Sequence, residues 1–198
     1  MTNNAQQIEI RKPKDFDTVR SYEEFERIEL GGHKLVIKDV SVVRTQNGAQ
    51  QLIISYDTSK GDRQPEFYAA AYRADTRTPK KWGGSTRLFI KDYDGTTNRQ
   101  FKTFCTAVEN SNPGFNTAWG TQFCAQFIGK SVGGVFGLEE YRNAEGKKTA
   151  IHKLFWFRKA DNIEKIEIPK PRLLDDDQDA ENSAFDDLVY MSDEDLPF

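Results

Sequence analysis

Two runs of apolar and β-branched residues decide the fold: KLVIKDVSVV at residues 34–43 and QLIISYD at residues 51–57. Residues of these types favour strands. Asn47-Gly48 lies between the runs and tolerates the positive φ angles that a tight hairpin turn requires. In the second run, Leu52, Ile54 and Tyr56 alternate with Ile53 and Ser55, as residues on the two faces of a strand do. These runs therefore predict a β hairpin.

Three further segments are typical of strands. After a turn at Gly61-Asp62, alternation in Glu66–Tyr72 predicts a third strand that extends the hairpin into a meander. Ser131–Arg142 and Lys148–Lys159, joined by a turn at Asn143–Gly146, predict a second hairpin.

Helical spacing is found between these two groups of strands. In Arg99–Ser111, apolar residues recur at the i, i+3, i+4, i+7 positions of a helix that faces a core. The aromatic residues Trp119, Phe123 and Phe127 repeat every four residues and predict a second helix. Near the N-terminus, Ser21–Glu24 reads as a capping box that would begin a short helix.

The order of these elements predicts a fold class. Three strands, a helical connection and two more strands match the five-stranded OB barrel, although an unrelated α+β fold can share that order. We therefore expect a mainly β protein: a five-stranded OB-fold-like barrel with a helical connection between strands 3 and 4 and a disordered acidic C-terminal tail. The predicted divisions are an N-terminal extension (1–30), an OB-like nucleic-acid-binding domain (31–172) and the tail (173–198).

Composition limits the function classes. The 198 residues contain no apolar run of membrane-spanning length and no signal-peptide core, so we expect a cytoplasmic protein without a membrane partner. The histidines His33 and His152 are isolated, and no Cys/His spacing resembles a zinc site. We expect no cofactor, no metal site and no catalytic residue.

Charge is divided unevenly along the chain. Residues 173–198 hold ten acidic residues and no basic one, and these ten belong to a total of 31 Asp and Glu against 28 Lys and Arg. The remaining 21 acidic residues leave the body with a surplus of seven positive charges. Such a body attracts polyanions, and the tail can compete for the same surface or be offered to another protein. Treated as a flexible chain, the tail has an r.m.s. span of roughly 28 Å.

The last eight residues, MSDEDLPF at 191–198, carry a resemblance. They are similar to the acidic C-terminal tip of bacterial single-stranded-DNA-binding proteins, in which a run of Asp precedes an aliphatic residue, Pro and Phe. More loosely, the stretch from Phe101 through Asn112–Phe115 to Lys170-Pro171 resembles proteins from replication modules of phages of Gram-positive bacteria. The resemblance implies a host-cell cytoplasmic protein of DNA replication, recombination and repair. Its tip would recruit partner proteins through Asp193, Glu194, Asp195, Leu196, Pro197 and Phe198.

Candidate nucleic-acid contacts gather in Arg73–Lys91, where six basic residues and several rings stand with a single acid, Asp75. Single-strand binders combine cations with exposed rings in this way. The segment also fits a solvated basic loop whose rings belong to the core. Tyrosines on the predicted strands and a cluster near residue 156 add further candidates. The full set is Tyr56, Tyr68, Tyr72, Arg73, Arg77, Lys80, Lys81, Trp82, Arg87, Lys91, Tyr93, Lys153, Trp156 and Arg158.

The sequence therefore predicts sequence-independent binding and protection of single-stranded DNA, without enzymatic activity. A protein-interaction adaptor and a single-strand annealing recombinase are the alternatives, and a metal-dependent nuclease is a more distant one. The oligomeric state stays open.

Overall fold

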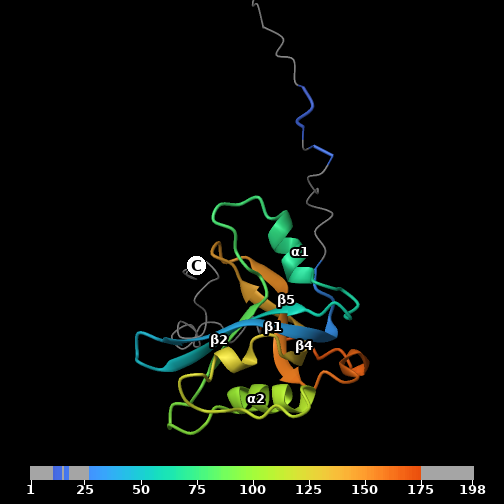
Figure 1. Cartoon of the computed structure of the whole chain (residues 1–198). Helices are drawn as coiled ribbons and strands as arrows, with labels where there is room; N and C mark the ends of the chain where they lie inside the picture. The colour runs from blue at the N-terminus through green and yellow to red at the C-terminus, as the bar shows by residue number, and fades with distance from the viewer. Residues whose placement is uncertain (1–10, 15, 18–26, 175–198) are drawn as a thin grey trace, which may run out of the picture.

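The central strand of the sheet is β1 (Gly31–Arg44), which pairs with a neighbour on each side. The computed structural model describes residues 11–14, 16–17 and 27–174. They form the antiparallel sheet β3-β2-β1-β4-β5 with α helices and 3-10 turns (Figure 1). The elements are β1 (Gly31–Arg44), β2 (Gln50–Thr58), α1 (Phe67–Ala74), β3 (Ser85–Phe89), α2 (Arg99–Ser111), η2 (Ala125–Phe127), β4 (Ser131–Arg142), β5 (Lys148–Arg158) and η3 (Ile163–Lys165).

The two edge strands leave the sheet open. β1 pairs with β2 from Leu35↔Thr58 to Arg44↔Gln50, and with β4 from Gly31↔Phe136 to Val36↔Ser131. β3 pairs with β2 and β5 pairs with β4, but within the described residues β3 and β5 do not pair with each other. The protein is therefore mainly β with five antiparallel strands, as expected, but the sheet is not closed into the expected barrel.

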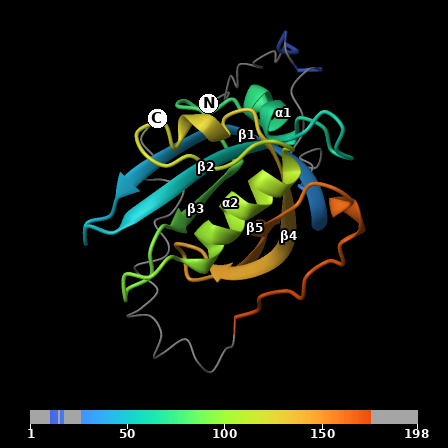
Figure 2. The same ribbon diagram turned by 60° about the horizontal axis from the view of Figure 1, so that its bottom comes forward.

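The main core lies between one face of the sheet and α2. Leu35, Ile37, Leu52 and Ile54 are fully buried on the strands. They belong to the same apolar cluster as the buried face of α2, whose members are Phe101, Phe104, Cys105, Ala107 and Val108. Figure 2 shows α2 lying across the strands. Full burial of one such aliphatic side chain contributes about 1.5–3 kcal/mol. The face of the sheet that carries the alternating apolar residues is therefore the one that packs against α2.

A smaller core covers the opposite face of β1 and β4. There Ile163 of η3 is 1% exposed and lies against Gly32 and Gly133. A Cβ at Gly32 would collide with the Ile163 carbonyl, and one at Gly133 would lie 2.8 Å from both Ile163 Cδ1 and the Lys159 oxygen. These glycines permit the close approach of η3.

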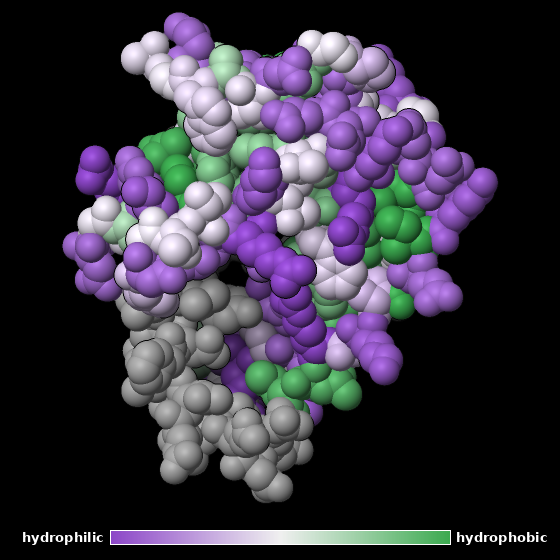
Figure 3. Space-filling model, turned by 90° about the horizontal axis from the view of Figure 1, so that it is seen from below, coloured by the Kyte–Doolittle hydropathy of each residue, from purple (hydrophilic) through white to green (hydrophobic). Residues whose placement is uncertain are grey.

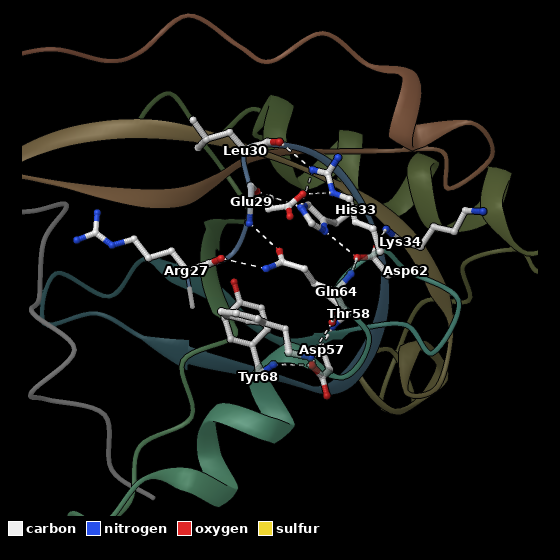
Figure 4. Close-up of polar contacts among 12 residues, drawn as sticks. Arg27, Glu29, Leu30, His33, Lys34, Asp57, Thr58, Asp62, Gln64 and Tyr68 are labelled. Atoms are coloured by element: carbon white, nitrogen blue, oxygen red, sulfur yellow. Dashed lines mark hydrogen bonds and ion pairs between the residues drawn. The ribbon is translucent and has the colours of Figure 1, made fainter. Parts of the chain in front are cut away.

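A polar network fixes the chain that leads into β1 (Figure 4). The His33 ring is fully buried, and its Nδ1 lies 2.8 Å from Asp62 Oδ1. The other carboxylate oxygen of Asp62 accepts a hydrogen bond of 2.7 Å from the backbone N–H of Lys34. Gln64 holds the incoming chain, since its side chain accepts from the N–H of Glu29 and donates to the carbonyl of Arg27. The loop after β2 is thereby tied to the start of β1.

The predicted third strand is wrong, because Phe67–Ala74 forms the helix α1. Two side chains at the end of β2 accept its first N–H groups: Asp57 Oδ1 accepts from Tyr68 at 2.9 Å, and Thr58 Oγ1 accepts from Phe67 at 2.8 Å. The first N–H groups of a helix have no partner inside the helix, so side chains that accept hydrogen bonds from them stabilise its start. Its run of three alanines also favours helix over strand, and the residue alternation did not reveal this.

The true third strand, β3, lies inside the segment expected to be a basic loop. It pairs with β2 from Gln51↔Phe89 to Ser55↔Ser85, and it buries Leu88. The predicted second helix is also wrong, because the stretch before η2 consists of turns. Gly120, with φ at 113°, interrupts helical geometry directly after Trp119.

The remaining strands and the first helix are confirmed. α2 spans Arg99–Ser111, and β4 and β5 form the second hairpin with its turn at Asn143–Gly146. The capping box at Ser21–Glu24 and the acidic residues 175–198 lie outside the described residues. In the part of the chain that is described, none of the helices has the length and apolarity needed to cross a bilayer.

Candidate nucleic-acid interface

A groove runs along α2, where the chain leaves β3 and β5. β3 and β5 run in the same direction, because each is separated from β1 by one antiparallel neighbour. Ile90 and Lys91 follow β3, Phe157 and Arg158 end β5, and Lys159 follows β5. Together with α2 and the loop at residues 117–119, they line an open groove of about 1220 Å³. We call this surface the α2 groove.

Positive charge dominates the α2 groove. Its basic side chains are Lys91, Arg99, Lys102, Arg158 and Lys159, and Glu109 is the acidic residue among those lining it. Lys159 pairs with Asp161 at 2.7 Å. The other four cations form no ion pair with the residues that the structure describes. They are therefore available to a polyanion. Figure 3 views this side of the molecule and shows hydrophilic surface across its middle, with hydrophobic surface in separate patches.

Trp119 supplies an exposed ring at the groove. Its side chain is 72% exposed, and it stacks on Phe123 with ring centroids 5.2 Å apart and an interplanar angle of 15°. Phe123 in turn contacts the buried rings of Phe101 and Phe127. A stack anchored in the core holds the indole in place and leaves most of it to solvent.

Hydrogen bonds also hold the loop that carries Trp119. The side chain of Gln126 accepts from the N–H of Ala118 and donates to its carbonyl, each at 2.7 Å. Glu109 accepts from the N–H of Thr117 at 3.0 Å. Hydrogen bonding from Thr117 lowers the pKa of Glu109, so this carboxylate remains ionised while it holds the loop. These hydrogen bonds hold the loop and the ring of Trp119 in place without a ligand.

Cys105 lines the groove but is 4% exposed. Burial raises the pKa of its thiol to about 11. The thiol therefore stays protonated at neutral pH, which is the unreactive form of cysteine.

Of the sequence-predicted contacts, Lys91 and Arg158 line the α2 groove. A second group, which we call the α1 cluster, consists of Tyr72, Arg73, Lys80 and Trp82. Tyr72 is 38% exposed, with Lys80 Nζ 5.6 Å above its ring and the Trp82 ring at 5.8 Å. The Trp82 indole N–H donates to the carbonyls of Tyr56 and Gly84, so Trp82 also anchors the loop.

The other basic residues of the predicted loop differ in their surroundings. Arg77 pairs with Asp75 at 2.9 Å, and its hydrogen bonds hold the pKa of that carboxyl well below its usual range. Arg87 is half-buried on β3, opposite Ile53 of β2, and Lys81 is half-buried in the preceding loop. The charge of Arg77 is therefore balanced by Asp75, whereas Arg87 is a residue of the edge strand β3.

Two predicted stacking residues are buried, which overturns their expected exposure. Tyr56 is 3% exposed and Tyr68 is 8% exposed, and their rings meet edge to face at 5.5 Å. Burial also raises the pKa of Tyr68 well above its usual value. Tyr56 shares the inward face of β2 with Leu52 and Ile54, and α1 carries Tyr68 into the same core. Neither ring can stack on a base.

Three predicted contacts lie apart from both surfaces. Lys153 pairs with the buried carboxylate of Glu139 at 2.6 Å. Trp156 is half-buried, and its indole N–H is buried without a hydrogen-bond partner among the described residues. Tyr93 is 95% exposed, but it stands in a turn between Asp92 and Asp94, whose charges repel phosphate.

No protein-family model and no curated protein matches this chain. Among those described, no three or more His, Cys, Asp or Glu side chains are grouped so as to hold a metal ion.

Sequence reasoning missed four groove residues: Trp119, Arg99, Lys102 and Lys159. The four-residue spacing of Trp119, Phe123 and Phe127 predicts a helix and does not mark Trp119 as exposed. Arg99 and Lys102 are three residues apart on α2, on one side of the helix, and this spacing was a usable signal. Nothing local in the sequence indicates that Lys159 meets them.

Proposed function

We propose that this protein binds single-stranded DNA without reading its sequence, and that it does so in the α2 groove. The observation that carries the proposal is the combination of four cations, which form no ion pair within the described part of the chain, with the exposed, supported ring of Trp119. Cations neutralise phosphates and release counterions, while an exposed ring stacks on a base for about 1–3 kcal/mol. Duplex DNA keeps its bases stacked on each other, so the ring favours single strands.

The topology supports the nucleic-acid-binding part of this proposal. The order β3-β2-β1-β4-β5, with α2 between β3 and β4, is the order that an OB barrel would have if it were opened between its third and fifth strands. OB folds commonly bind oligonucleotides. We therefore infer an OB-like body that acts in DNA replication, recombination or repair.

The acidic tail gives the protein a second role in this proposal. The last described residue, Leu174, is held at the β4–β5 hairpin, where its N–H donates to Glu140 and its carbonyl accepts from Lys148. The ten acidic residues beyond it are opposite in charge to the basic side chains of the groove. We infer that they compete with DNA for the groove, and that the tip at residues 193–198 recruits replication or recombination proteins once DNA has displaced it.

Fluorescence anisotropy tests the binding proposal. Labelled oligo-dT and a labelled duplex of equal length are titrated with the full chain across a salt series. We expect tighter binding of the single strand and a negative dependence of log affinity on log salt concentration. Lys102→Glu should weaken binding, whereas Lys165→Glu should not, because Lys165 lies on η3, which packs on β1 and β4. The proposal fails if neither nucleic acid binds, or if the two variants behave alike.

A further inference from the structure

β3 connects the two surfaces that combine rings with cations. Its first residue, Ser85, follows the loop of the α1 cluster, in which Trp82 is bound to Gly84. Its last residue, Phe89, leads into Ile90 and Lys91 of the α2 groove. Figure 1 shows α1 and α2 on opposite sides of β1 and β2, so the two surfaces lie at opposite ends of β3. At about 3.3 Å per residue, β3 itself spans about 13 Å.

As an edge strand, β3 presents backbone groups along this span. Its antiparallel bonds with β2 include Tyr56 N–H to the Gly84 carbonyl at 2.7 Å and Ile90 N–H to the Gln50 carbonyl at 3.1 Å. Even-numbered residues therefore bond to β2, and the N–H groups of Ser85, Arg87 and Phe89 face away from it. Such N–H groups can donate to phosphate oxygens.

The side chains of β3 add a charge between its two ends. Leu88 points into the core, so Arg87 points to the opposite face of the sheet. Arg87 forms no ion pair with the residues that the structure describes. It thus continues a row of positive charge from Arg73 and Lys80 at one end to Lys91 at the other.

The nearby acidic groups lie at the ends of this row and not within it. Asp75 is bound by Arg77. Asp92 accepts from the Asn98 side chain at 2.6 Å, and Asp94 accepts from the N–H of Thr96 at 2.9 Å. These two carboxylates belong to a turn that lies beyond the end of β3.

We propose that one single strand occupies both surfaces at once, running along the edge of β3 from Trp119 in the α2 groove to Tyr72 in the α1 cluster. This inference rests on the proposed function and defines the path of the strand across the protein. A short oligonucleotide fills the α2 groove alone, because that is where the ring is most exposed and the cations are most numerous. A longer one also reaches Arg87 and the α1 cluster.

Oligonucleotide length tests the path. Affinities are measured for oligo-dT of about 4 and about 16 nucleotides, the limits of typical site sizes. Trp119→Ala should weaken both probes by roughly 5- to 150-fold, the fold-change that corresponds to a lost stack. Arg73→Ala and Arg87→Ala should weaken only the long probe, and each should lower its salt slope by about one. Lys165→Ala is the matched control and should change neither.

Three results would overturn the path. In the first, Arg73→Ala leaves the long probe as tightly bound as Lys165→Ala does. In the second, two short probes bind each chain independently and length adds no affinity, which means two separate sites. In the third, no wild-type binding occurs at any length, and then the proposed function itself fails. Circular dichroism of each variant confirms that it is folded.

Discussion

Trp119 is the residue on which base stacking in the α2 groove depends. Trp119→Ala removes the exposed ring but no charge. We expect it to weaken oligo-dT binding by about 1–3 kcal/mol and to leave the slope of log affinity against log salt unchanged, since that slope counts neutralised phosphates. Trp119→Phe keeps a smaller ring on Phe123 and should recover part of the loss. An equal affinity for wild type and Trp119→Ala, measured by anisotropy, would contradict this role.

Gly32 is a packing residue, because a side chain there would collide with the carbonyl of Ile163. Gly32→Ala should lower the free energy of unfolding by about 1–3 kcal/mol, the usual cost of overpacking. Gly61→Ala is the control, since no atom lies within 4 Å of a Cβ at that position. Urea unfolding of the two variants checks this, and equal midpoints would show that η3 moves aside without cost.

Asp62 makes stability depend on pH. Its side chain is 4% exposed. Burial acts to raise the pKa of this carboxyl, but hydrogen bonds from His33, Gln64 and Lys34 outweigh it and leave the pKa below its usual value. The stabilisation is therefore complete above about pH 4, the pKa of an unfolded Asp, and is lost as the pH falls through the folded value.

The expected result is that acid weakens the wild type more than Asp62→Asn. Urea unfolding at neutral pH and below about pH 4 measures the difference in unfolding free energy between the two proteins. That difference should shrink in acid, because the variant has no carboxyl to protonate at position 62. A difference that stays constant with pH would show that Asp62 contributes only through packing.

At the scale of elements, the spacing of apolar residues predicts a strand or a helix correctly where one period is clear. The hairpin around Asn47-Gly48, the helix α2 and the hairpin of β4 and β5 were all predictable, because their apolar positions have one consistent period. The strand prediction for Glu66–Tyr72 is wrong because its alanines fit the period of a strand as well as that of a helix. The helix is favoured by Asp57 and Thr58, which accept hydrogen bonds from its first N–H groups and belong to the end of β2. No local pattern contains that contact.

The candidate site was only partly predictable for the same reason. Lys91 and Arg158 could be selected by residue type, but they meet because β3 and β5 end at the same side of α2. Tyr56 lies in a strand with alternating residues, and the alternation alone does not show which face of the strand is exposed to solvent. Tertiary placement therefore decides both which rings are buried and which cations gather.

At the scale of the whole molecule, the chain separates a basic body from ten acidic residues at its end. A chain that ends at Leu174 keeps the contacts of Leu174 with Glu140 and Lys148 and loses all ten acids. We expect this truncation to bind oligo-dT more tightly than the full chain at low salt, with the gain fading as salt screens the charges. Anisotropy titrations of the two chains measure the gain. Unchanged affinity would contradict competition by the tail.

The most direct test of the account is to locate a bound base. The full chain is irradiated in complex with an oligo-dT that carries photoreactive 5-iododeoxyuridine, and the cross-linked peptides are identified by mass spectrometry. We predict that the main cross-link lies on the peptide containing Trp119 and that Trp119→Ala abolishes it. Cross-links confined to peptides outside the α2 groove, in a complex that does form, would contradict the account.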